Sequence, residues 1–193
     1  MLYLRLFTIT FLAFCLFGGN SNGFVTPANA GKNIAKNNAK KLGPVTGLPL
    51  PRFVSLRSSK VNARTGPALR YPIQWIYKRA HLPVEVTAEF EAWRQIRDKE
   101  GSISWVHSTL LSGQRSALIQ FNAQAASTDT HTGVISAYKK PNAQSRVVLQ
   151  VEAGAIGEIK QCKQDFCLVD FKAYRGWVAK NTIWGIYPDE VIE

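Results

Sequence analysis

Two stretches, AHLPVEV at residues 80–86 and AGAIGEI at residues 153–159, carry the pattern that decides the fold. Each is followed by an aromatic residue and then by a Trp-Val pair, at 105–106 in the first copy and 177–178 in the second. The offset that relates Ala80 to Ala153 also relates Glu85 to Glu158, and a single deletion shortens it before the second Trp-Val pair. Repetition of one supersecondary unit predicts two domains of the same fold in tandem.

The chain is predicted to be all-β. Short runs rich in β-branched and aromatic residues alternate with loops broken by Gly and Pro, such as Asn62–Pro67. No stretch offers ten residues of helical periodicity. The strands predicted in the first copy are Phe53–Arg57, Gln74–Tyr77, Val84–Ala88, Trp93–Arg97 and Ser104–His107. We therefore expect two small barrels in tandem.

Changes in composition along the 193 residues predict six segments. They are a signal peptide (1–30), a flexible basic tether (31–50), a first domain (51–118), a linker (119–132), a second domain (133–187) and a tail (188–193). The run Ala117–Phe121 is ambiguous, because it could close the first barrel or open the second.

The N-terminus predicts export. Its apolar run, Leu6–Phe17, is too short for a membrane-spanning helix, which needs about 20 residues, but it fits a secretory signal. Ala28-Asn29-Ala30 supplies a cleavage site with small residues. The alternatives are an uncleaved membrane anchor and a lipoprotein processed at Cys15, which the bulky Phe14 disfavours. We expect a periplasmic or secreted protein.

Cys162 and Cys167 are the cysteines that remain after cleavage. The four residues between them fit a hairpin turn, which would place the two thiols opposite each other at disulfide distance. We expect a disulfide, with free buried thiols and a redox pair as the alternatives. The chain lacks the Cys and His spacing of a zinc site, so neither a metal nor a cofactor is expected.

Several motifs together carry a family resemblance. They are Val54–Arg57, Val61–Pro67, Leu82–Val86, Trp93–Asp98 and Gly101 with Trp105–His107 in the first copy, and Cys162, Phe166–Val169, Arg175–Val178 and Trp184–Gly185 in the second. In these motifs the chain resembles secreted bacterial SH3-like (SH3b) domain proteins, from about Leu48 to Ile186. The resemblance implies two tandem SH3-like domains that bind cell-wall peptides or assist a wall hydrolase. Two departures are Phe166, where the family often has Trp, and residues 137–141, which lack the Asn-x-Arg-x-Gly-Pro loop of the first copy.

Catalysis is not expected. His81, His107 and His131 are isolated, and a nucleophile needs a base within reach. A wall hydrolase is therefore disfavoured. Binding is the better hypothesis, and its candidate residues are Arg64, Tyr71, Trp75 and Trp93, in and around the loop of the first domain. The alternative is that the aromatic side chains fill the small cores.

The formal charge of +11 is unevenly distributed. Residues 31–50 carry four basic and no acidic residues, 51–118 carry eleven and five, and 119–193 carry eight of each. We expect association with an anionic surface through residues 31–79, and a cell-wall peptide or envelope protein as the partner. Nucleic acid is not expected, because no recognition motif accompanies the charge. Two alternatives stay open: a solvated basic surface without a partner, and a scaffold for a protein, including a host protein.

Overall fold

The computed structural model describes residues 41–122, 124–125 and 133–193. The predicted signal peptide (1–30) and the first half of the predicted tether (31–40) lie outside these ranges, as does His131. Within the described ranges, no helix has the length and apolarity to cross a membrane.

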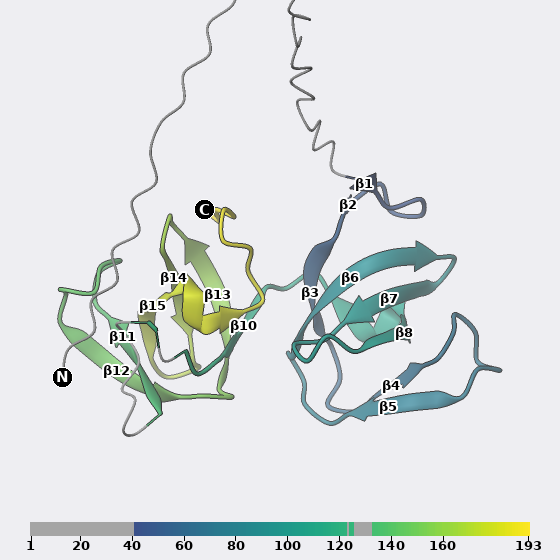
Figure 1. Cartoon of the computed structure of the whole chain (residues 1–193), viewed down its shortest axis with the longest axis horizontal. Coiled ribbons are helices and arrows are strands. Elements are labelled where there is room, and N and C mark those ends of the chain that lie inside the picture. Colours follow the sequence, from purple (N-terminus) through teal and green to yellow (C-terminus); the bar gives the residue numbers. More distant parts are fainter. Residues whose placement is uncertain (1–40, 123, 126–132) are drawn as a thin grey trace, which may run out of the picture. The chain divides into compact units, whose positions relative to one another are not determined.

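The first domain is an antiparallel sheet in the order β5-β4-β8-β7-β6-β3-β9 (Figure 1). Its elements are β3 (Arg52–Leu56), β4 (Val61–Arg64), β5 (Ile73–Tyr77), β6 (Pro83–Phe90), β7 (Trp93–Arg97), β8 (Ile103–His107), the 3-10 turn η1 (Ser108–Leu110) and β9 (Leu111–Ser112). The five predicted strands are confirmed. The first residues of the predicted loop Asn62–Pro67 belong to strand β4 instead. In this strand, Val61 and Ala63 point into the core.

The second domain is an antiparallel sheet in the order β12-β11-β15-β14-β13-β10-β16. Its elements are β10 (Ser116–Ile119), β11 (Val134–Tyr138), β12 (Val147–Glu152), β13 (Ile156–Cys162), β14 (Phe166–Asp170), β15 (Arg175–Ala179), η2 (Lys180–Thr182) and β16 (Ile183–Trp184). The order matches that of the first sheet, element by element, and β6 and β13 begin at equivalent positions of the repeat, Pro83 and Ile156. The all-β class and the tandem SH3-like architecture are therefore confirmed.

Each domain has its own apolar core. The same positions of the repeat fill both cores: Ile96 corresponds to Val169 and Val106 to Val178, and all four side chains are fully buried. Burying one such side chain contributes about 1.5–3 kcal/mol, so the repeat conserves the positions that stabilise each barrel most.

Strand β10 opens the second barrel, which settles the ambiguity of Ala117–Phe121. It pairs with β13 and β16, and its four residues are buried. A domain boundary at residue 118 would cut this strand. The predicted linker, residues 119–132, therefore loses its first residue to β10. Residues 123 and 126–132 of the linker lie outside the described ranges.

Residues 41–50 are ordered, which corrects the prediction of a flexible tether as far as residue 50. Strands β1 (Lys41–Leu42) and β2 (Pro49–Leu50) form a hairpin, and Leu50 is buried in the first core. The buried carboxylate of Glu89 accepts hydrogen bonds at its Oε2 atom from the backbone N–H groups of Val45 and Thr46, at 3.0 and 2.9 Å. We call residues 41–50 the N-terminal arm.

The predicted disulfide is confirmed. Cys162 and Cys167 are paired across β13 and β14, with their Cα atoms 4.0 Å apart, and their sulfur atoms are bonded. The turn between them closes with a hydrogen bond from the Lys163 N–H to the Phe166 carbonyl. The bond therefore ties one hairpin of the second domain.

Candidate functional site

The predicted binding residues Arg64 and Tyr71 lie together in the β4–β5 hairpin. The Arg64 guanidinium donates a hydrogen bond from Nη1 to the Tyr71 carbonyl oxygen at 2.7 Å. The Tyr71 ring covers Gly66 so closely that a Cβ atom there would lie 2.7 Å from it, which explains the glycine. Both side chains thus hold the loop in shape.

Trp93 does not join them. It lies on the central strand β7 and is only 8% exposed, and its ring packs edge-on against His107 with 5.4 Å between ring centroids. Successive residues of a strand face opposite sides, and Ile96 of the same strand belongs to the first core, so Trp93 is buried with His107 on the opposite face of β7. Trp93 is therefore a buried packing residue and is not open to a ligand.

Trp75 is the predicted residue that is open to solvent. It is 51% exposed on β5, the end strand of the first sheet (Figure 1). Its neighbours Ile73 and Ile76 are 45% and 46% exposed. Three large apolar side chains on one end strand form an exposed apolar surface of the kind that marks interaction sites.

Trp75 and Ile76 border a cavity of about 530 Å³, which we call the β5 groove. Its lining is mostly apolar and comes from β5 and from residues of both domains: Trp75, Ile76, Tyr77, Arg79, Leu82, Pro83, Asp98, Lys99, Glu100, Ser102, Leu118 and Gly154. An apolar hollow with a few polar groups at its edge is the usual form of a ligand site.

The buried carboxylate of Asp98, at the edge of this groove, is committed to structure. Its Oδ1 atom accepts the backbone N–H groups of Glu100 and Ser102 at 3.1 and 2.8 Å, and its Oδ2 atom accepts the Tyr77 hydroxyl at 3.0 Å. Burial and the adjacent Asp98 charge both raise the pKa of the Tyr77 phenol well above its usual range. These groups fix the shape of the groove.

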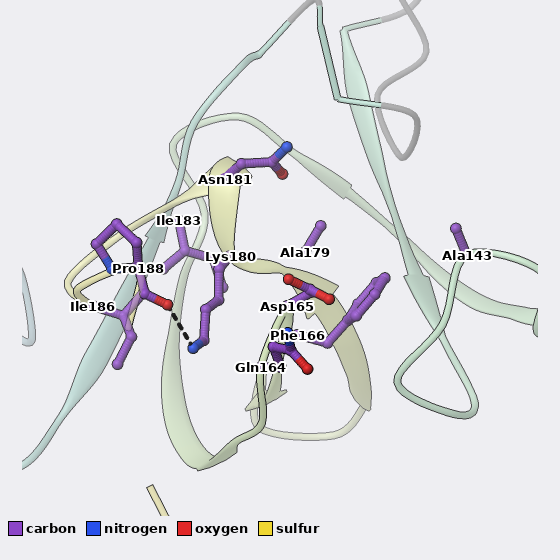
Figure 2. A pocket seen from close by; sticks show the side chains of 10 residues that line it. All are labelled: Ala143, Gln164, Asp165, Phe166, Ala179, Lys180, Asn181, Ile183, Ile186 and Pro188. Carbon is purple, nitrogen blue, oxygen red and sulfur yellow. Dashed lines mark hydrogen bonds between the residues drawn. The ribbon is translucent and has the colours of Figure 1, made fainter. Parts of the chain in front are cut away.

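A second cavity, of about 580 Å³, lies in the second domain beside the disulfide hairpin (Figure 2). Lys180 points into it from η2, with Asp165 and Phe166 on the other side. The buried Lys180 ammonium donates to the carbonyl oxygens of Pro188 and Glu190 at 3.0 and 2.7 Å. It thereby anchors the C-terminal tail. This lysine was not predicted from the sequence, because nothing in its local pattern distinguishes it from a surface lysine.

A buried glutamate that sequence reasoning also missed joins the two domains. Glu85 is 2% exposed, accepts the Arg97 Nε–H at 2.7 Å and accepts the Tyr187 hydroxyl of the second domain at 2.8 Å. Burial and the bond to Glu85 raise the pKa of the Tyr187 phenol above its usual range. Beside this contact the Trp184 indole N–H donates to the Pro83 carbonyl at 3.2 Å. These bonds hold the wall of the groove near Pro83.

The β4–β5 hairpin is strongly basic. Between Phe53 and Val84 there are six basic residues and no acidic one: Arg57, Lys60, Arg64, Arg70, Lys78 and Arg79. None of the six takes part in an ion pair with another described residue. By contrast, the first domain's Glu85, Glu89 and Glu100 are all paired with cations. The uncompensated charge of the domain is therefore concentrated beside β5.

Metal chemistry has no support among the described residues, since no three of their His, Cys, Asp and Glu side chains gather in a way that could hold an ion. No curated protein sequence matches the chain. Among solved structures, it is similar to NlpC2 and NlpC1 of Trichomonas vaginalis, each at 13% identity, with TM-scores of 0.30 and 0.31. The alignments cover 69% and 74% of this chain and 48% of each of those chains, so it spans about half their length. At these TM-scores the likeness supports no conclusion about function.

The bacterial SH3 domain family matches two regions, residues 57–113 and 133–185. The two regions contain all strands of the two sheets except β3 and β10. Together they cover more than half of the chain. The chain belongs to the bacterial SH3 domain family, with two copies of the domain in tandem.

Proposed function

We propose that this protein is an exported, non-catalytic binding module that holds peptidoglycan or another cell-envelope component through the β5 groove of its first domain. Bacterial SH3 domains commonly bind cell-wall components. The observation that carries the proposal is the half-exposed Trp75 beside an apolar groove. An indole ring offers a large apolar face for stacking and an N–H at its edge.

Export is supported by two observations. The N-terminal sequence has the length and cleavage pattern of a secretory signal, and the Cys162–Cys167 disulfide belongs to an oxidising compartment. Bacterial SH3 domains together with a disulfide are typical of exported proteins. The non-catalytic assignment rests on the family, because bacterial SH3 domains are typically binding modules.

Co-sedimentation of the mature chain with purified cell-wall sacculi at low salt tests this function. We expect the wild-type chain to pellet and Trp75→Ala to weaken binding about tenfold, as expected for a central aromatic contact. Phe90→Ala is the matched control, because Phe90 is 50% exposed on another hairpin. A wild-type chain that stays in the supernatant, or an equal loss in both variants, contradicts the proposal.

A protein-binding scaffold is the second candidate function. The specific observation in its favour is the open backbone edge of β5, since this strand pairs with β4 alone among the described strands.

A further inference from the structure

Strand β5 has one of the usual protections of a sheet edge, a register shift against β4 between the pairs Ala63–Trp75 and Arg64–Ile73, but its residues from Trp75 to Tyr77 pair regularly. Its five residues, Ile-Gln-Trp-Ile-Tyr, contain neither a charge nor a proline, and it is longer than β9, the two-residue strand at the other end of the sheet. Natural proteins normally shield such edges with charged residues, Pro or bulges that turn them away. The regular, uncharged part of this edge, from Trp75 to Tyr77, is a template on which an extended segment can add as a further strand.

The corresponding edge of the second domain differs in charge. Strand β12 ends in the acidic Glu152 and is preceded by the basic Arg146. Strand β5 has only basic residues on both sides, with Arg70 before it and Lys78 and Arg79 after it. The two edges are therefore suited to different partners.

Pairing of β5 with a second copy of itself is disfavoured. In an antiparallel pair, Arg70 of one copy would approach Lys78 and Arg79 of the other, and like charges placed opposite each other across strands are destabilising. The six basic residues of the hairpin lack ion-pair partners among the described residues, so no charge of the chain itself offsets this repulsion. An acidic partner gains instead from all of them.

The β5 groove adjoins this edge. Trp75 and Ile76 belong both to the end strand and to the groove wall, together with Leu82, Pro83 and Leu118. A strand added along β5 would turn alternate side chains toward the groove. Apolar side chains at those positions fit its lining.

From these features we propose that β5 binds an extended, acidic polypeptide segment by strand addition, with apolar side chains at alternate positions entering the β5 groove. Main-chain hydrogen bonds to β5 hold the segment, and the basic hairpin selects for acidic residues at its ends. This inference goes beyond envelope binding, because a polypeptide strand is a different class of partner from a glycan.

Synthetic peptides test strand addition directly. The probe alternates valine and threonine over five residues, with two glutamates at each end, and calorimetry measures its binding to the full mature chain. Two further peptides carry N-methyl groups on one or the other set of alternate residues. Because an added strand uses the N–H groups of one edge, we expect one set to abolish binding and the other to leave most of it.

Charge is tested by replacing the glutamates of the probe with lysines. At low salt we expect the acidic probe to bind at least about tenfold more tightly than the lysine probe. This difference in affinity should shrink as salt is added. In the protein, Lys78→Glu should weaken the acidic probe about tenfold. Lys139→Glu is the matched control, because it makes the same charge change at an exposed position of the second domain, and it should change binding less than about twofold.

Several results overturn the inference: no binding of the acidic probe, equal binding of both N-methylated peptides, equal binding of the lysine probe, or equal losses in the two lysine variants. A dimer with protected β5 amides would assign the edge to a second copy instead. Sacculus binding is a separate readout. If the chain pellets with sacculi but does not bind the peptides, the proposed function stands and this inference is wrong. If it binds the peptides but does not pellet with sacculi, this inference stands and the proposed function is wrong.

Discussion

The two domains share one strand order but tie the same hairpin with different chemistry. Glu89 and Arg94 are paired across β6 and β7 in the first domain, and at the equivalent positions of the second the disulfide-bonded Cys162 and Cys167 are paired across β13 and β14. In the first domain the link is electrostatic, with 3.6 Å between Arg94 Nε and Glu89 Oε1. Equivalent positions of the two domains are thus linked by an ion pair in one and by a disulfide in the other.

The same corner also docks the segment of chain that leaves the repeat. Glu89 binds the N-terminal arm through the backbone of Val45 and Thr46. Cys162 exchanges two backbone hydrogen bonds with Ile192 of the C-terminal tail, at 2.7 and 3.0 Å. The first domain binds the N-terminal arm through a charged side chain, and the second domain binds the C-terminal tail through backbone hydrogen bonds. We therefore predict that low pH destabilises this corner of the first domain and that reduction of the disulfide destabilises it in the second.

The largest difference is expected at Glu85 and Glu158, which occupy equivalent positions of the repeat. Glu85 is buried and binds the half-exposed Arg97 and the Tyr187 hydroxyl, whereas the Glu158 side chain is 36% exposed and pairs with Lys160. Each hydrogen bond to a buried charged group contributes about 1.5–3 kcal/mol, but an exposed pair contributes at most about 1 kcal/mol. Urea unfolding should therefore show a large loss for Glu85→Ala and a small one for Glu158→Ala.

Glu85→Gln is the control for the shape of the side chain, since it retains an oxygen for the Tyr187 hydroxyl but removes the charge. Its loss should lie between those of the two alanine variants. Equal losses for Glu85→Ala and Glu158→Ala would show that burial does not distinguish the two positions.

The next largest effect is a pH dependence of the first domain. Burial alone would raise the pKa of Glu89, but hydrogen bonds from Thr46, Arg52 and Val45 outweigh burial and lower the pKa to about 2. Because folding lowers this pKa, the contribution is fully present above about pH 4.5 and is lost as the pH falls toward 2. The full shift corresponds to about 3 kcal/mol.

Unfolding free energies measured between pH 5 and pH 2 check this expectation, with Glu89→Gln as the variant. The variant should be less stable than the wild type at pH 5 and should lose less stability on acidification. Amide exchange should also show a more open N-terminal arm in the variant. Parallel pH profiles of the two proteins would contradict the assigned role of Glu89.

The sequence predicted most of the fold because the repeat and the strand patterns are local features. The offset between the two copies, which changes by only one residue, located equivalent strands, and the spacing of Cys162 and Cys167 predicted their disulfide. It did not predict the order of the N-terminal arm, whose contacts with Glu89 join segments far apart in the sequence. It also left β10 ambiguous, because its partners β13 and β16 lie far along the chain.

The candidate site was predicted less completely, because residue type alone does not separate a buried tryptophan from an exposed one. Trp93 lies on a central strand and Trp75 on an end strand, and only the pairing of strands distinguishes them. The roles of Glu85 and Lys180 were missed for a similar reason. Each is bound by groups that are distant in sequence or belong to the tail, so a local pattern carries no sign of its burial.

A smaller effect is expected from the disulfide. It closes a ring of only a few residues, for which the loop-entropy relation gives about 2 kcal/mol. The double variant Cys162→Ala with Cys167→Ala should lose about this amount in urea unfolding, and reductant should destabilise the wild type but not the variant. A wild type indifferent to reductant would contradict this stabilising role.

The smallest effect on stability is expected at Trp75, and comparing it with the effect at Trp93 distinguishes an exposed groove residue from a buried one. Half of the Trp75 side chain already faces solvent, so Trp75→Ala should change the free energy of unfolding by less than about 1 kcal/mol. Trp93→Ala, at a buried position, should cost about 3–5 kcal/mol. Thermal unfolding of the two variants measures this contrast. A loss at Trp75 as large as that at Trp93 would mean that the exposed indole supports the barrel itself, and the effect of Trp75→Ala on binding would then no longer report on the groove.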